Sequence, residues 1–358
     1  MSFSVRDSVP ANPMTWALVV ATYKREDVLP RCLRLAAAQG RPPIEIIVVD
    51  ASPGWESMRE LVLGEIAPQW PATRWSYLKA ERRSLTFQRN QGARAASADV
   101  LFFFDDDSLM YPDCAAGIMR VYDADLDRGV AGVNATYLPD PPDAPGSQVK
   151  ATEFTTAKNY GPAARRVRRW LRAEDIHVPY DRPSAARPLP AAIAALPIDR
   201  WVTAAGSGMT FRREITLAEP FEEILINYAA GEDTDMGFRA QRHGVYVGAR
   251  EGRLCHLGHG SGRAPTFVWA VFNMLNPVVL SALYSTNRQR LPMRHRRMLV
   301  RRLFLSVAKD AYYRRWTLPT ARGALVALLM VGTIFRKSEE ELRSWYPNYQ
   351  RELYNRGG

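Results

Sequence analysis

The sequence predicts an α/β fold built on a doubly wound sheet. Short apolar runs, typical of strands buried on both faces, alternate with segments whose apolar residues recur at helical spacing. The first, second and fourth of these runs end in polar residues, and ligands bind beyond the carboxyl ends of the strands in such sheets. The same pattern therefore predicts both the fold class and the edge of the sheet at which a ligand binds.

Strands and helices are expected to alternate from residue 14 to residue 137. Strands are expected at residues 16–21, 44–49, 75–78, 100–104 and 130–137. Helices are expected between them, at residues 27–39, 55–66, 85–96 and 112–124. Strand–helix–strand repetition of this kind indicates a sheet with a large parallel part.

The pattern changes twice in the second half of the chain. Residues 139–197 are rich in proline and read as an excursion or loop over the site. Beyond it, order resumes at residues 204–211, followed by a helical segment at 231–243 and short strands near 245–249 and 253–256.

After about residue 264 the chain is apolar and aromatic. Residues 266–284 are interrupted by Asn273, Asn276 and Pro277, and residues 323–335 are too short, because a membrane-spanning helix needs about 20 apolar residues. Two readings stay open for this extension. Its helices lie in a membrane interface, among aromatic and basic residues, or they form a helical subdomain packed on the core.

The net charge of +11 is concentrated in two arginine clusters. They consist of Arg165, Arg166, Arg168, Arg169 and Arg172, and of Arg294, Arg296, Arg297, Arg301 and Arg302. Such clusters suit nucleic acid, anionic lipid or a phosphorylated substrate, and a solvated surface is the alternative. The chain has three cysteines without metal-type spacing, which indicates a reducing compartment. No secretion signal is recognised at the N-terminus. Together these two observations lead us to expect a cytoplasmic protein.

Three consecutive carboxylates, Asp105, Asp106 and Asp107, follow the strand at 100–104. They repel one another unless a cation or basic groups compensate. Alternate residues of an extended segment share a side, so Asp105 and Asp107 can converge while Asp106 points elsewhere. Hard oxygen ligands of this kind suit Mg²⁺ or Mn²⁺ together with substrate phosphate. The alternative, a helix N-cap, needs only one acidic residue.

These segments resemble the family 2 glycosyltransferases, which have the GT-A fold. The resemblance is carried by TYKRED, VVDASP, QRNQGARAASAD and FFFDDDSLMYPD, and then by GSGMTFRRE and GEDTDMGFRAQRHG. It implies a GT-A domain over residues 14–260, with a nucleotide-binding half at 14–137, the excursion at 138–200 and an acceptor half at 201–260. A helical extension, 261–358, follows.

The resemblance also implies roles for individual residues. Thr22, Tyr23 and Arg25 would line the nucleotide, Asp50 would accept a hydrogen bond from the base, and Arg89 and Asn90 would contact the nucleotide or hold the site. Asp107 would bind the metal directly, with Asp105 or Asp106 on the ribose or a metal-bound water. Asp233 would be the catalytic base, and His256 would complete the metal site. For Arg89 a structural ion pair is the alternative, and for Glu232 and Asp233 a helix start.

The expected function is metal-dependent inverting transfer of a sugar from a nucleoside-diphosphate sugar, with a UDP-sugar preferred. The cofactor is Mn²⁺ or Mg²⁺, and a mixed carboxylate and imidazole shell favours Mn²⁺. The acceptor is expected to be a glycan or polyprenyl-linked, in cell-surface polysaccharide synthesis at the cytoplasmic face of the inner membrane. A sugar nucleotidyltransferase is an alternative, but it needs a glycine-rich loop where ATYKRED stands. A basic nucleic-acid-binding or scaffold protein is the other, although the acidic run would repel a polyanion.

Overall fold

The computed structural model describes residues 13–144, 166, 187–201, 203–258, 264–286 and 288–356. Its centre is a mixed sheet with the strand order β3-β2-β1-β4-β8-β6-β9-β5, and β7 pairs with β9 beside this path. The strands are β1 (Trp16–Thr22), β2 (Glu45–Asp50), β3 (Arg74–Lys79), β4 (Val100–Phe104), β5 (Ser108–Met110), β6 (Val130–Tyr137), β7 (Ile198–Arg200), β8 (Gly208–Arg212) and β9 (Val245–His256). The predicted α/β class with a mixed, doubly wound sheet is confirmed.

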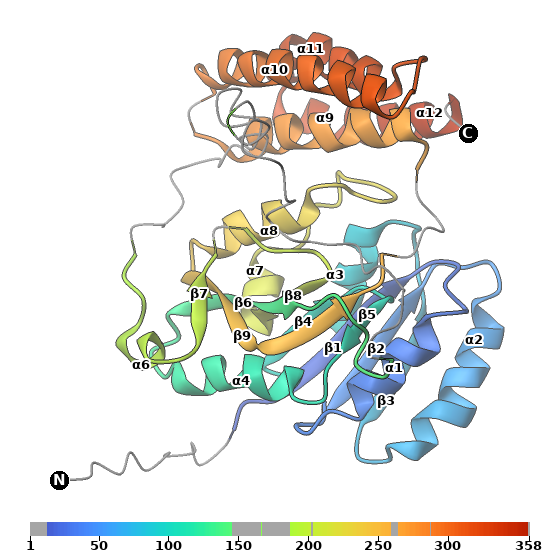
Figure 1. The fold of residues 1–358 in the computed structure, drawn as a ribbon, viewed down its shortest axis with the longest axis vertical. Helices are drawn as coiled ribbons and strands as arrows, with labels where there is room; N and C mark the ends of the chain where they lie inside the picture. The colour runs from blue at the N-terminus through green and yellow to red at the C-terminus, as the bar shows by residue number, and fades with distance from the viewer. Residues whose placement is uncertain are drawn as a thin grey trace.

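Helices cover both faces of the sheet (Figure 1). They are α1 (Leu29–Ala37), α2 (Trp55–Leu61), α3 (Leu85–Ala95), α4 (Cys114–Ala124), α6 (Ala191–Ala194), α7 (Arg213–Ala218) and α8 (Glu232–Ala240). Alternate residues of β1 point to opposite faces. Leu18 and Val20 pack with α1, α2 and α4, whereas Ala17 and Val19 pack with α3, α7 and α8. Both faces are buried, which is why the strands are apolar throughout.

The strand order explains which polar residues meet. β1 pairs in parallel with both β2 and β4, so the polar ends of these three strands lie at one edge, with Thr22 opposite Asp50. Antiparallel β8 begins beside the end of β4, where Gly208 pairs with Phe104. His256, the last residue of β9, pairs with Ser108. The ends of five strands, β1, β2, β4, β8 and β9, therefore meet at the edge where the acidic run lies.

Several local expectations need correction. The two short strands expected near 245–249 and 253–256 are one strand, β9, whose pairing with β6 shifts register after Ala249. Strand β5 and helix α7 were not expected. The helix expected from 55 to 66 changes after Leu61 into a π-helical turn, η1 (Val62–Ile66), and is followed by the 3₁₀ turn η2 (Ala67–Gln69). The chain continues from Asp107 directly into β5, so the acidic run does not cap a helix.

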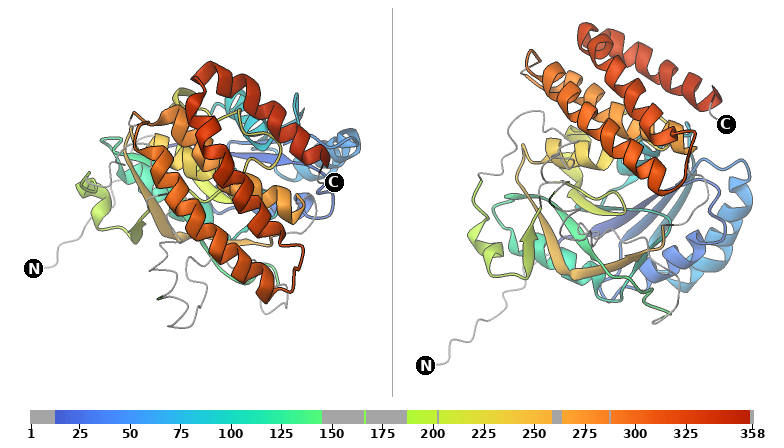
Figure 2. Two further views of the ribbon diagram at one scale, coloured as in Figure 1. Left: turned by 90° about the horizontal axis from the view of Figure 1, so that it is seen from above. Right: turned by 45° about the horizontal axis from the view of Figure 1, so that its top comes forward.

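The C-terminal extension is a layer of four helices above the sheet (Figures 1 and 2). They are α9 (Thr266–Tyr284), α10 (Leu291–Tyr312), α11 (Pro319–Arg336) and α12 (Glu339–Arg356). Two of them, α9 and α11, are long and apolar enough to cross a membrane by length and composition. In α9, however, 72% of the apolar window is buried in the protein, against 39% in α11. Helix α9 packs on Ile224, Leu225 and Phe238, so it is a core helix.

Candidate active site

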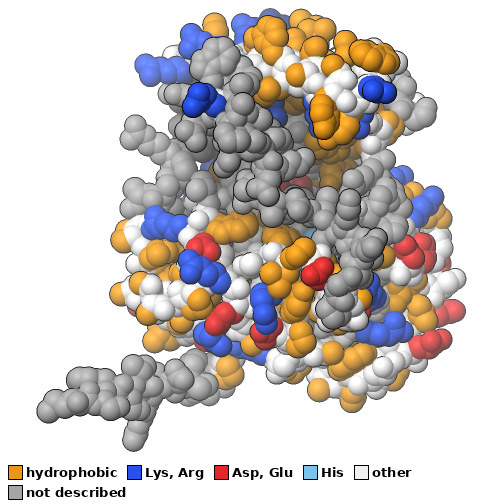
Figure 3. All heavy atoms as spheres, in the orientation of Figure 1, with side chains coloured by type: hydrophobic (Ala, Val, Ile, Leu, Met, Phe, Trp, Pro, Cys, Tyr) orange, Lys and Arg blue, Asp and Glu red, His pale blue; other side chains and the backbone are white. Residues whose placement is uncertain are grey.

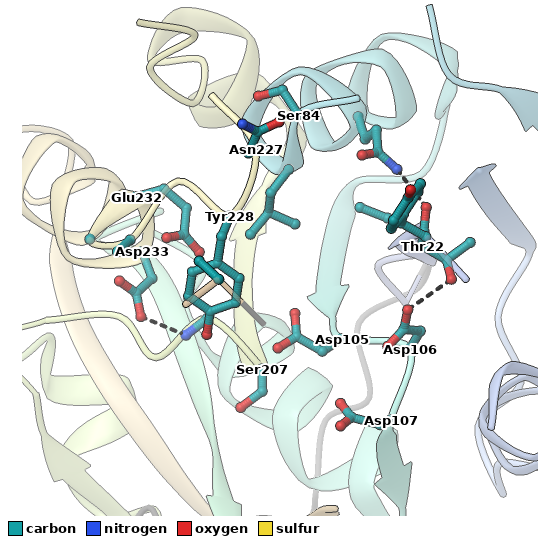
Figure 4. Close-up of a pocket in the computed structure, with 18 of the residues that line it drawn as sticks. Thr22, Ser84, Asp105, Asp106, Asp107, Ser207, Asn227, Tyr228, Glu232 and Asp233 are labelled. Atoms are coloured by element: carbon teal, nitrogen blue, oxygen red, sulfur yellow. Dashed lines mark hydrogen bonds between the residues drawn. The ribbon is translucent and has the colours of Figure 1, made fainter. Parts of the chain in front are cut away.

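A cavity of about 430 Å³ lies where the sheet edge, α8 and the C-terminal helices meet. One wall comes from the ends of β1, β4 and β9, and the opposite wall from the start of α8 (Figure 4). The predicted residues that line it are Thr22, Tyr23, Arg25, Asp105, Asp106, Asp107, Asp233 and His256. The fold therefore brings residues that are up to 234 positions apart in the sequence into one pocket.

Asp105 and Asp107 converge on His256, as alternation along an extended segment predicts. Nε2 of His256 lies 3.1 Å from Oδ1 of Asp107 and 3.7 Å from Oδ2 of Asp105. Burial lowers the pKa of His256, but its hydrogen bond to Asp107 and the surrounding carboxylates outweigh this and raise that pKa above its ordinary value. Burial raises the pKa of Asp105, and the Arg89 charge opposes the rise.

These three residues fit a divalent cation. One ligand atom from each of Asp105, Asp107 and His256 lies within 4.8 Å of the other two. Two carboxylates and an imidazole form a hard, anionic donor set that a first-row divalent ion can bridge, with positions left for phosphate oxygens and water. The neighbouring carboxylates also repel one another, and a cation relieves that repulsion.

Asp106 points away from this group, toward β1. Its Oδ2 accepts a hydrogen bond from the Thr22 hydroxyl at 2.8 Å, and Nε of Arg25 lies 3.6 Å from its Oδ1. Burial raises the pKa of Asp106 to about 7, although Arg25 lowers it. Asp106 thus stabilises the end of β1 and the loop after it, and it does not face Asp105 and Asp107.

The β1 side of the cavity holds a stacked pair that the sequence did not reveal. The Arg83 guanidinium lies 3.8 Å from the ring centroid of Tyr23, and both line the cavity. Asp50 lies behind this wall. It is 2% exposed and accepts hydrogen bonds from the Tyr77 hydroxyl at 2.5 Å and from the backbone N–H of Ser52 at 2.7 Å. Its contact with a base stays a prediction.

Arg89 and Asn90 lie beneath the cavity on α3. The Arg89 guanidinium is buried and donates to Glu232 at 2.7 Å, to Asp105 at 2.9 Å and to the backbone O of Gly206 at 2.8 Å. The structural ion pair left open by the sequence is therefore present. The Asn90 amide donates to the backbone O of Phe221 and to Glu223, and so fixes the chain before α8.

Asp233 lies in the first turn of α8, the helix start expected for it. Gly231 precedes the helix with φ of 93°, a conformation that favours glycine. Oδ2 of Asp233 accepts a hydrogen bond from the backbone N–H of Gly206 at 2.9 Å. Burial and the Asp233 charge raise the pKa of the adjacent Glu232. The helix start thus holds Asp233 rigidly at the cavity edge.

The remaining wall comes from residues that were not predicted from the sequence. Loop residues Asn227 and Tyr228, helix residues Trp269 and Asn273 of α9, and Tyr354 of α12 all line the cavity. A signal was available in part, since Trp269 and Asn273 are four positions apart and therefore share a face of α9.

Trp201 does not line the cavity. It packs over Gly248 of β9, where an added Cβ would lie 2.5 Å from the indole nitrogen, and it is partly buried against the core. The first arginine cluster, apart from Arg166, lies outside the described residues.

Comparison with known proteins gives one family match and several structural matches. The family model described as Glycosyl transferase family 2 matches residues 17–175. No curated protein matches the chain. Among solved structures, GalNAc-T7 with UDP, GalNAc and Mn²⁺ has a TM-score of 0.52 at 14% identity, over 80% of this chain and 51% of that one. The chain thus spans about half the length of that protein.

Two more structures are similar over most of their lengths, at lower TM-scores. The mannosyltransferase PcManGT from Pyrobaculum calidifontis, solved with GDP-Man and Mn²⁺, is 16% identical over 97% of this chain and 88% of that one, with a TM-score of 0.47. S. aureus TarS 1–349 is 13% identical over 96% of this chain and 89% of that one, with a TM-score of 0.48. The matched residues 17–175 hold β1 to β6 and the acidic run, so this part of the chain is similar to glycosyl transferase family 2, and the likeness to GalNAc-T7 shows a GT-A-like fold.

Proposed function

We propose that the protein is a metal-dependent inverting glycosyltransferase that moves a sugar from a nucleoside-diphosphate sugar to an acceptor hydroxyl. The observation that carries the proposal is the placement of two acidic groups on one cavity. Asp105 and Asp107 converge with His256 on one wall, and Asp233 stands on another. A nucleotide-binding protein needs the first group, whereas transfer to a hydroxyl also needs a base.

Asp233 is the base in this proposal. It accepts the proton of the acceptor hydroxyl while the hydroxyl oxygen forms a bond to the anomeric carbon. The bond from that carbon to the diphosphate oxygen breaks on the opposite face, and its electron pair leaves with the diphosphate. One displacement inverts the anomeric configuration, so a second carboxylate nucleophile is not required. Asp233 Oδ2 accepts the N–H of Gly206 at 2.9 Å and Oδ1 accepts the N–H of Thr234 at 2.7 Å, so each oxygen keeps a lone pair with which it would accept the proton.

A divalent cation held by Asp105, Asp107 and His256 would neutralise the charge that develops on the diphosphate. Mn²⁺ is preferred because the donor set mixes carboxylate with imidazole. The first donor to test is a UDP-sugar, since GalNAc-T7 was solved with UDP and Mn²⁺. Thr22, Tyr23, Arg25 and Arg83 then contact the nucleotide from the β1 side.

The acceptor is proposed to enter between Asp233 and the C-terminal helices. Trp269 offers an aromatic face for a sugar ring, and Asn273, one turn away, offers an amide. Tyr354 reaches the same cavity from α12. Aromatic faces with a few polar groups suit a glycan or a polyprenyl-linked saccharide, as in cell-surface polysaccharide synthesis.

A transfer assay with nucleoside-diphosphate sugars and Mn²⁺ tests the proposal. Asp233→Asn keeps the shape of the side chain but removes the base, so turnover is expected to fall by about 10²–10⁴-fold. Donor binding should stay intact. Asp107→Asn should weaken cation and donor binding together. Asp127→Asn, at an exposed turn before β6, is the matched control. Turnover by Asp233→Asn equal to that of the control would refute the role of the base.

A further inference from the structure

Helices α10 and α11 expose a broad apolar face on the outside of the protein. On α10, exposed apolar residues recur at spacings of seven, four and three and therefore lie on one side of the helix. They are Met293, Val300, Phe304 and Val307. On α11, Leu325 and Leu329 are exposed one turn apart, and 71% of Leu329 is accessible. These six residues define the α10–α11 face.

The two helices contribute to one continuous surface. An added Cβ at Gly332 of α11 would meet the guanidinium of Arg296 of α10 at 2.9 Å, so the helices adjoin beside their exposed sides. At the other end, Asp310 of α10 accepts hydrogen bonds from the first backbone N–H groups of α11, at Thr320 and Ala321. Figure 3 shows hydrophobic side chains gathered there, at the top of the molecule, with Lys and Arg beside them.

The charge around this face has a single sign. Residues 291–336 include ten Lys and Arg residues and one acidic residue, Asp310, which is fully buried. Arg294, Arg297 and Arg301 follow one flank of the apolar stripe on α10, and Arg296 lies on the other. A second copy of this surface would bring like charges together, which opposes self-association through the face.

The connection between the helices is aromatic and basic. Tyr312, Tyr313 and Trp316 are 82%, 55% and 76% exposed. The Arg315 guanidinium lies 5.1 Å from the Tyr313 ring centroid. Aromatic rings with a polar edge, placed beside arginine, are the side chains that favour the boundary between lipid headgroups and acyl chains.

We propose that the α10–α11 face is a docking surface for an anionic phospholipid bilayer. The helices lie in the plane of the interface, where Phe304, Leu329 and Trp316 enter the acyl boundary and the flanking arginines meet lipid phosphate. Neither helix needs to cross the bilayer. The inference does not depend on the proposed catalysis, because no residue of the face lines the cavity. Docking would nevertheless hold the catalytic cavity near the membrane, since α9 supplies both the cavity wall and the underside of this layer.

Sedimentation of the full chain with lipid vesicles tests the proposal. Vesicles of phosphatidylcholine with phosphatidylglycerol should bind the protein, and vesicles of phosphatidylcholine alone should bind it far less. Arg297→Ala and Arg301→Ala should each weaken binding about fivefold, and the double variant about 25-fold. Phe304→Ser and Trp316→Ser should each weaken it about tenfold. Leu126→Ser, at an exposed leucine on the sheet domain, is the control and should bind as the parent does.

Equal binding of the protein to both vesicle types would overturn the proposal. Unchanged vesicle binding by Phe304→Ser and Trp316→Ser would do the same, as would tighter binding to single-stranded RNA than to anionic vesicles. A concentration-dependent dimer that Phe304→Ser converts to monomer would assign the face to a second copy instead. Asp233→Asn should bind vesicles normally, and Phe304→Ser should transfer sugar to a soluble acceptor normally, so docking and catalysis fail separately.

Discussion

The buried guanidinium of Arg89 donates a hydrogen bond to Glu232 at 2.7 Å. The same group donates to Asp105 at 2.9 Å, so one cation on α3 joins the acidic run after β4 to the acidic start of α8. Arg89 does not line the cavity, but it fixes the distance between these two acidic segments. In the proposed reaction, one segment binds the cation that assists departure of the diphosphate, and the other carries the base that deprotonates the acceptor.

Arg89→Met should destabilise the protein strongly. It leaves buried Glu232 without its cation, which costs about 3–5 kcal/mol for a broken buried ion pair. Urea unfolding measures this cost, and transfer assays on the folded fraction should show a lower turnover. Arg120→Gln is the control, because the Arg120–Glu251 pair is exposed and worth less than about 1 kcal/mol. Equal losses in the two variants would contradict the bridging role.

Asn276→Leu should reduce both stability and turnover. The Asn276 amide donates to the backbone O of Ala230 at 2.7 Å and accepts from the Tyr346 hydroxyl, so it ties α9 to α12 and to the chain just before Asp233. Leaving these groups unpaired costs about 2–5 kcal/mol. Tyr346→Phe removes only one of the two bonds and should cost less.

A double-mutant cycle between Asn276→Leu and Tyr346→Phe tests this coupling, because paired groups give a non-zero interaction energy. Asn348→Ala, at an exposed asparagine on α12, is the matched control. Additive losses at Asn276 and Tyr346 would show that the two side chains act separately.

Removal of divalent cations should abolish sugar transfer, and Mn²⁺ should restore it. In a thermal-shift panel of UDP, GDP, dTDP and CMP with Mn²⁺ or Mg²⁺, the cognate nucleotide and cation together should raise the unfolding temperature, because ligands that bind only the folded state stabilise it by mass action. His256→Ala should increase the Mn²⁺ concentration needed, since it removes one of three ligands. Transfer that persists at full rate in a chelator would exclude the metal site.

Acidification should destabilise the C-terminal layer through His295. Burial, together with the Arg294 charge, lowers the pKa of His295 from 6.5 to about 4. Between pH 6.5 and pH 4, His295 is protonated in the unfolded chain but stays neutral in the folded chain. The free energy of unfolding therefore falls as the pH drops from 6.5 toward 4. Between about pH 8 and pH 5 the loss is about 2 kcal/mol.

His295→Leu should flatten this part of the stability profile and raise stability at neutral pH, because both ring nitrogens of His295 are buried and have no hydrogen-bond partner among the described residues. The same change at His243, whose side chain is 39% exposed, is the control. Identical profiles for the parent and His295→Leu would reject the assignment.

The sequence predicted most of the strands because their apolar runs are buried on both faces, and it placed the acidic run at the correct edge. It did not predict β5, which is only three residues long, or the continuity of β9, whose register shift occurs at polar residues 250–252. These features depend on pairing with strands far along the chain.

The same limit applies to the cavity. Thr22, Asp105 and Asp107 follow strands and could be expected there. The spacing of Trp269 and Asn273 places them on one face of a helix, but it does not show that this face lines the cavity, because that depends on which elements pack against α9. In the sequence, Asn273 and Asn276 only interrupt an apolar stretch. In the structure, Asn273 lines the cavity and Asn276 is a buried hydrogen-bonding partner.

The wall that α9 and α12 contribute to the cavity has a practical consequence for protein engineering. A C-terminal truncation intended to produce a more soluble enzyme would remove Trp269, Asn273 and Tyr354 and uncover Leu225 and Phe238. For the same reason, a chimera that exchanges the C-terminal helices would replace the wall proposed to receive the acceptor along with the proposed membrane-docking face. Point changes on the outer side of α10 and α11 are the way to alter attachment alone.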